Sequence, residues 1–197
     1  LHLLSRRQRQ MCIRDSITVV DDRLANVISF EQRKSINEPL YRGQIYIDME
    51  NNALLRVDFE VNPQYIEQAA GMVVERKSRN LRITPQKVAY TVSYKQWNGT
   101  YYINHIRGDL HFKIKKRRQL FNTNILHTWF EMVTCKIDTA NVNRFSRIES
   151  LPTRTVFSDT HFNYDEGFWG DFNVILPEDK LNEAISRITS KIEETNY

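Results

Sequence analysis

The sequence has little cysteine, glycine or proline and no long apolar run. Its 197 residues include 2 Cys, 6 Gly and 5 Pro. Two cysteines form no disulfide framework, and no CxxC pair occurs. An aromatic content of 11% and the absence of low-complexity tracts argue against global disorder. No stretch is apolar for long enough to cross a bilayer as a helix, so we expect no transmembrane segment in this sequence.

Motifs that carry chemistry are also absent. The sequence contains no GxSxG elbow, no HExxH and no glycine-rich phosphate loop. The histidines outside the first 16 residues are not spaced as the Cys and His ligands of a metal site are. We therefore interpret them as polar surface residues. They are His105, His111, His127 and His161. We therefore expect no catalytic residue, no cofactor and no metal.

A cluster of carboxylates near the C-terminal end leaves one enzymatic alternative. A hydrolase could use two of them at a fixed separation. Helix capping and loop positions explain them more simply, because no calcium-loop spacing repeats. The cluster comprises Asp159, Asp165, Glu166, Asp171, Glu178 and Asp179.

The positive net charge comes mainly from the first 16 residues. Four arginines and Asp15 contribute +3 of the formal +4, which leaves +1 for residues 17–197. The letters RRQRQMCIRDS resemble translated sequencing-library adapter, so we interpret residues 1–16 as a non-native or disordered segment; the alternative is a genuine basic tail. We expect no nucleic-acid partner, because the basic run Lys115–Arg118 has the character of a solvated strand end.

The stretch Tyr41–Val61 alternates strictly between apolar and polar residues. Ile45 and Ile47 share one strand face, and Val57 and Phe59 share a face after a polar Glu-Asn-Asn turn. Period-2 alternation predicts two half-buried strands with one charged face, which favours antiparallel pairing.

Further strands are expected downstream. Val88–Tyr94 alternates with Val92 and Tyr94 on one face, and Asn98-Gly99 is a strong hairpin signal before a return strand. Gly108 within that return strand suggests a bulge. The stretch 128–137 has apolar residues on both faces, so we expect a central strand with Cys135 in the core.

Two helices complete the prediction. A short helix or a helix-to-strand passage is expected within Gln64–Lys77, and an amphipathic helix at about 178–194. An aromatic segment precedes the second, and we expect the two together to cover the apolar face of the sheet as a lid. The lid residues are Phe168, Trp169, Phe172 and Ile185. The predicted class is mainly β (α+β), with residues 17–197 as a single domain built on a curved antiparallel sheet or half-barrel.

Several segments in this order resemble the C-terminal region of the carboxypeptidase-like regulatory-domain-containing proteins of the bacterial cell envelope. The most specific pieces are G-x-I-Y-I-D at Gly43–Asp48 and F-W-x-D-F-N-x-I-x-P at Phe168–Pro177. The hairpins also look like those of lipoprotein-carrier (Lol-type) half-barrels, whose concave face holds acyl chains. The resemblance implies no peptidase activity. It implies that the chain is the C-terminal part of a longer, exported protein, periplasmic or associated with the outer membrane.

The function predicted from the sequence is therefore a non-enzymatic cell-envelope domain with a binding or assembly role. The alternatives are a lipid or lipoprotein carrier with an apolar cavity and the hydrolase above. The expected partner is a lipid or an envelope protein. The predicted apolar face or cavity comprises Ile45, Ile47, Val57, Phe59, Val92 and Tyr94.

Overall fold

The computed structural model describes residues 16–75, 78–117, 123–140 and 142–147, together with residues 150, 152, 155 and 170. The chain divides into two units, Leu1–Thr134 and Cys135–Tyr197. The strands and helices below all belong to the first unit. The helix predicted at about 178–194 lies outside the described residues.

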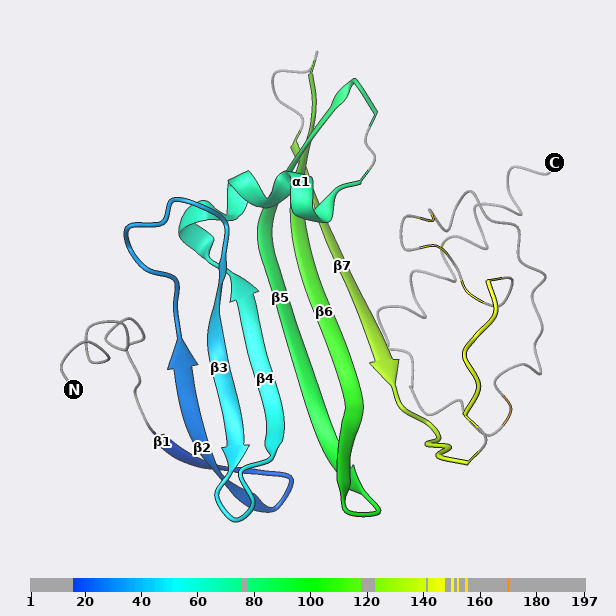
Figure 1. Cartoon of the computed structure of the whole chain (residues 1–197). Coiled ribbons are helices and arrows are strands. Elements are labelled where there is room, and N and C mark those ends of the chain that lie inside the picture. Colours follow the sequence, from blue (N-terminus) through cyan, green and yellow to red (C-terminus); the bar gives the residue numbers. More distant parts are fainter. Residues whose placement is uncertain are drawn as a thin grey trace. The chain divides into compact units, whose positions relative to one another are not determined.

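Seven strands form one antiparallel sheet whose spatial order follows the sequence (Figure 1). The strands are β1 (Ser16–Val20), β2 (Arg23–Phe30), β3 (Tyr41–Asp48), β4 (Leu54–Val61), β5 (Leu81–Trp97), β6 (Thr100–Lys116) and β7 (Thr123–Val133). Each strand pairs with its neighbour in the chain, so the sheet is a meander. This confirms the mainly β, antiparallel class. The described sheet is open, with β1 and β7 at its edges.

The predicted hairpin at Tyr41–Val61 is present as β3 and β4. Asn52 adopts φ +59 in the turn, and the Asn51 side chain accepts the Ala53 N–H at 2.9 Å. Asp48 is fully buried at the start of this turn. Its carboxylate accepts the Glu50 N–H at 2.8 Å and forms an ion pair with Arg23 of β2. Asp48 therefore joins the hairpin turn to the preceding strand.

The pairing of β5 with β6 is the longest in the sheet. Asn98 and Gly99 form its two-residue turn with φ +46 and +80, and Trp97 pairs with Thr100. Positive φ at both positions is what a type I′ hairpin turn requires. Each strand has 17 residues, and β5 begins at Leu81, well before the stretch Val88–Tyr94 predicted from alternation. Pro85 is buried beside an irregularity in the register, which suits a residue without an N–H to donate.

The bulge predicted at Gly108 was wrong. Gly108 pairs in register with Tyr90 on one side and Phe130 on the other. A Cβ at this position would lie 2.2 Å from the Phe130 ring. The glycine is needed because an aromatic ring from β7 crosses above it. The irregularity of β6 lies instead at Asn104, which the register skips between the pairs Ser93–His105 and Tyr94–Ile103.

The prediction of a central strand at 128–137 was also wrong. The strand is β7, which starts at Thr123, ends at Val133 and lies at an edge of the described sheet. Cys135 follows the strand and is exposed. Phe130 and Met132 are exposed by 42% and 59%. Apolar residues on both faces of a strand predict burial on both sides, but β7 has a single neighbour among the described strands.

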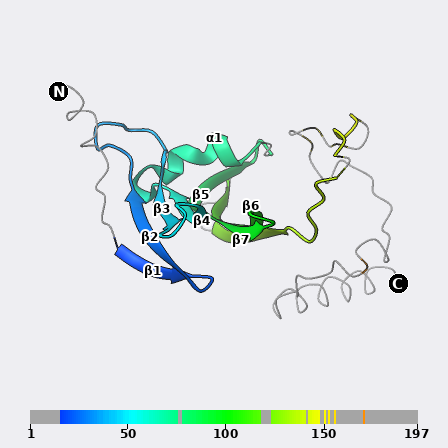
Figure 2. The same ribbon diagram turned by 60° about the horizontal axis from the view of Figure 1, so that its bottom comes forward.

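Two short helices pack on one end of the sheet. Asn62 and Pro63 end β4, and the Asn62 side chain caps η1 (Pro63–Ala69), which continues into α1 (Ala70–Val73). The short helix predicted within Gln64–Lys77 is thus present and ends before Arg76 and Lys77. The core cluster comprises Val61, Ile66, Ala69 and Val88, with Val73, Tyr90 and Leu110 packed against it. Figure 2 shows the helices together on one side of the sheet.

Replacing Gly43 by alanine is expected to destabilise the fold strongly. A Cβ there would lie 2.1 Å from the backbone oxygen of Asp58 and 2.7 Å from the Cα of Phe59, so β3 and β4 would have to separate. We expect Gly43→Ala to lower the free energy of unfolding by about 3 kcal/mol, at the upper end of the overpacking range. Urea denaturation measures this change. Gly71→Ala in α1 is the control, because nothing lies within 4 Å of its Cβ. If Gly43→Ala and Gly71→Ala are equally stable, the close approach of β3 to β4 does not require a glycine at position 43.

The Asp48 ion pair is expected to make stability fall in acid. The hydrogen bond from Arg23 holds the pKa of Asp48 below its ordinary value, against the opposing effect of burial. A depressed carboxyl pKa contributes stability that is fully present above the unfolded pKa of about 3.9 and is lost as pH falls through the folded pKa. Thermal unfolding from pH 6 to pH 2 is the measurement. Asp48→Asn should be less stable than the parent at pH 6 and should lose less stability on acidification. If the stabilities of the two proteins fall in parallel as pH is lowered, the ionised Asp48 carboxylate does not stabilise the fold.

Candidate functional site

An aliphatic row crosses six strands on the side of the sheet that carries the helices. Its members are directly paired from strand to strand: Ile28, Ile45, Val57, Val92, Ile106 and Met132. Directly paired residues point to the same side of a sheet. Val57 and Val92 also lie four positions from Val61 and Val88, on which the helices pack, so the row shares their face. We call this set the aliphatic row.

A second row, mostly aromatic, lies between the aliphatic row and the helix-covered core. It runs Phe30, Gly43, Phe59, Tyr90, Gly108 and Phe130. Phe59 stacks on Tyr90 with ring centroids 5.2 Å apart, and Tyr90 lies 6.4 Å from Phe130 across Gly108. Burial raises the pKa of Tyr90, as expected for a phenol among apolar side chains. Gly108 leaves room for the Phe130 ring, and Gly43 lets β3 lie close to the backbone of β4.

The structure brings the residues of the predicted apolar face together. Ile45, Val57 and Val92 belong to the aliphatic row, and Phe59 belongs to the aromatic row. Ile47 and Tyr94 follow on the same strand faces by alternation. All six predicted residues are half-buried. The predicted lid residues Phe168, Trp169, Phe172 and Ile185 lie outside the described residues.

The aliphatic row does not line the hollow of about 760 Å³ that is bounded by Phe59 and Tyr90 together with charged side chains such as Arg42, Asp58 and Glu60. The aliphatic row is therefore an apolar surface, half-buried along β3 to β6 and exposed at Met132.

The opposite face of the sheet is charged, as predicted. Arg42 lies 2.7 Å from Glu60, and Arg107 lies 2.6 Å from Glu131. These ion pairs join neighbouring strands. Each is partly exposed, so each stabilises the fold only modestly.

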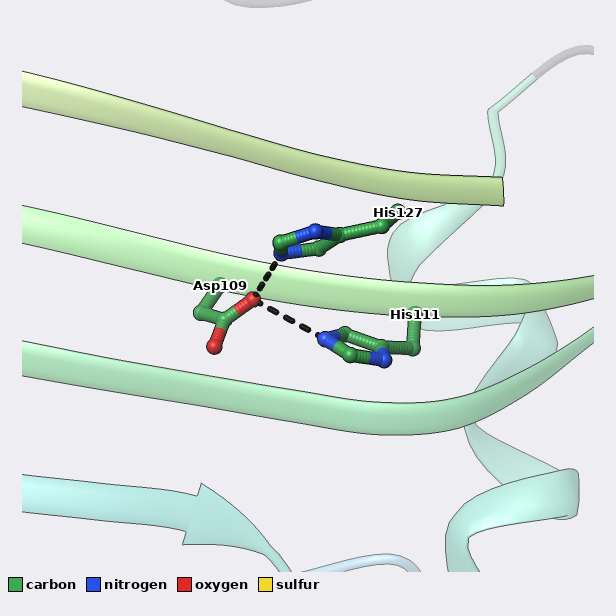
Figure 3. A group of neighbouring side chains, drawn as sticks. All are labelled: Asp109, His111 and His127. Atoms are coloured by element: carbon green, nitrogen blue, oxygen red, sulfur yellow. Dashed lines mark hydrogen bonds and ion pairs between the residues drawn. The ribbon is translucent and has the colours of Figure 1, made fainter. Parts of the chain in front are cut away.

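Two histidines and an aspartate meet on this charged face (Figure 3). His111 of β6 pairs directly with His127 of β7, and their ring centroids are 4.3 Å apart. Asp109 lies two residues before His111, so it shares the same face of β6. Its Oδ1 lies 3.2 Å from His111 Nε2 and 2.6 Å from His127 Nε2. We call these three residues the His–Asp cluster.

Lys87 of β5 contacts the same carboxylate from the other side. Its Nζ donates to Asp109 Oδ2 at 3.1 Å. Burial opposes ionisation of Asp109, but the hydrogen bonds from Lys87 and His127 outweigh it and hold the pKa of Asp109 below its ordinary value. The carboxylate is thus ionised at neutral pH, with its two oxygens facing different partners.

The sequence pattern does not predict the His–Asp cluster. The spacing Asp109-x-His111 within a strand does place both side chains on one face. His127 joins them only through the register of β6 with β7, which alternation does not predict. His105 lies elsewhere, 3.7 Å from Glu131. His161 and the carboxylates of the hydrolase alternative, Asp159, Asp165, Glu166, Asp171, Glu178 and Asp179, lie outside the described residues.

Comparisons with protein-family models, with curated proteins and with solved structures found no match to this chain. Within the described residues, every helix is too short or too polar to cross a membrane.

Proposed function

We propose that this chain is a non-enzymatic binding domain of the bacterial cell envelope that holds an acyl chain of a lipid or lipoprotein on its apolar face. The observation that supports the proposal is the aliphatic row, which is continuous across six strands. The described helices do not cover it, and its side chains are half-buried or exposed. The resemblance of Gly43–Asp48 and Phe168–Pro177 to cell-envelope proteins supports a periplasmic or outer-membrane-associated location.

The length of the row suits an extended acyl chain. With strands about 4.8 Å apart, its six members span about 24 Å. One leaflet of a bilayer's hydrocarbon core is about 15 Å thick, so an extended acyl chain fits within that length. Each methylene that leaves water contributes about 0.8 kcal/mol, so partial burial of one chain suffices for measurable binding.

In this proposal the sheet forms the wall of a half-barrel. The amphipathic helix predicted at about 178–194 and the aromatic segment before it act as the lid, and Phe168, Trp169, Phe172 and Ile185 are its predicted residues. The lid covers the ligand from water, which an open sheet face cannot do alone. The charged opposite face takes no part in acyl binding.

Fluorescent fatty-acid titration tests the proposal. Ile45→Gln puts a polar amide in the middle of the aliphatic row, and we expect it to weaken binding about tenfold, which corresponds to about 1.4 kcal/mol. Met132→Lys should have a similar effect with less risk to folding, because Met132 is 59% exposed.

The matched control is Gln44→Glu, one residue away on the opposite face of β3, which should leave affinity unchanged. Circular dichroism establishes that each variant is folded. If row variants and control bind the fatty acid equally, or if the parent does not bind it, the acyl-binding function is wrong.

A further inference from the structure

The His–Asp cluster has the composition and geometry of an incomplete metal coordination sphere. Asp109, His111 and His127 each offer one ligand atom, and these atoms all lie within 4.8 Å of one another. We infer that the cluster is a binding site for a divalent first-row transition metal of the Zn²⁺ type, held by His111 Nε2, His127 Nε2 and Asp109 Oδ1. This inference does not depend on acyl binding, because the cluster lies on the opposite face of the sheet.

The donor set favours this class of metal. Two imidazole nitrogens with one carboxylate oxygen suit Zn²⁺ and its neighbours, whereas Ca²⁺ and Mg²⁺ prefer oxygen ligands. Metal–ligand bonds of about 2.1 Å place neighbouring donor atoms about 3.0–3.4 Å apart. The 3.2 Å separation of His111 Nε2 from Asp109 Oδ1 already falls in that range. The 2.6 Å separation at His127 has to open by less than 1 Å.

The backbone holds the three ligands in place without a loop. Asp109 and His111 occupy alternate positions of β6, and His127 is the direct partner of His111 on β7. Adjustment at His127 is easy, since its side chain is 50% exposed. Each imidazole then binds through an unprotonated Nε2 and keeps its proton on Nδ1.

Lys87 helps to orient the carboxylate. Its contact with Asp109 Oδ2 leaves Oδ1 facing the two imidazoles. Partners of this kind, bonded to a ligand rather than to the metal, fix ligand orientation in metal sites. Three protein ligands leave at least one position for water, and the exposure of His127 gives solvent access to it.

Metal binding at this place joins the edge strand to the sheet. β7 has β6 as its only partner among the described strands, and the metal would bridge the two through His111 and His127. A ligand that binds only the folded state stabilises it by mass action. The site would therefore protect the exposed edge of the sheet from fraying when metal is present.

Isothermal titration of the full, tag-free chain with Zn²⁺ at pH 7.5 tests the inference. We expect one site per chain and an upward shift of the unfolding temperature when Zn²⁺ is added. Replacing one ligand, as in His127→Ala or Asp109→Asn, should weaken Zn²⁺ binding by more than about tenfold. Because His127 is half exposed, its loss should leave the fold intact without metal, which circular dichroism checks.

The matched control is His105→Ala, which removes a histidine from the same strand and the same face but outside the cluster. It should keep parental Zn²⁺ affinity. Nitrogen NMR provides a second readout, since coordination should shift Nε2 of His111 and His127 and leave His105 unchanged. Parental affinity in His127→Ala, an equal loss in His105→Ala, or unshifted Nε2 signals for His111 and His127 would each overturn the site.

Discussion

The structure depends above all on the antiparallel register between neighbouring strands. Side chains alternate across a sheet, so a slip of one residue would move every side chain of a strand to the other face. In the long pairing of β5 with β6, the turn at Asn98 and Gly99 places Trp97 opposite Thr100, and the register shifts once between Ser93 and Tyr94 before Val92 pairs with Ile106. The aliphatic row requires the registers of all six of its strands, and the His–Asp cluster requires the register of β6 with β7.

Close packing between rows depends on two glycines. Gly43 lets β3 approach β4, and Gly108 leaves the space that the Phe130 ring occupies. The aromatic row can therefore cross the sheet without forcing the strands apart. It forms the border between the core under η1 and α1 and the apolar surface that the described helices leave open.

The two faces of the sheet offer different chemistry to a ligand. On one face, Val57 and Val92 present an apolar surface with no charge. On the other, Asp109 is held between Lys87 and two imidazoles. A sheet one strand thick keeps these properties separate, since each side chain reaches only one side. An acyl ligand and a metal ion would accordingly bind without competing for residues.

The sequence by itself determined the elements and their faces. Alternation at Tyr41–Val61 and the Asn98-Gly99 pair predicted two hairpins that are present, together with the side on which Ile45, Val57 and Val92 lie. It also predicted a short helix within Gln64–Lys77 from apolar residues at helical spacing, where the structure has η1 and α1.

Only the tertiary structure decided which residues are neighbours. A period of two assigns a side chain to a face but does not say which strand lies beside it, so β7 was mistaken for a central strand and Cys135 for a core residue. For the same reason the sequence suggested a bulge at Gly108, whereas in the structure the Phe130 ring lies above this glycine. The meeting of His111 with His127 is the clearest case, because 16 positions of sequence separate two side chains that the β6–β7 register places directly opposite one another.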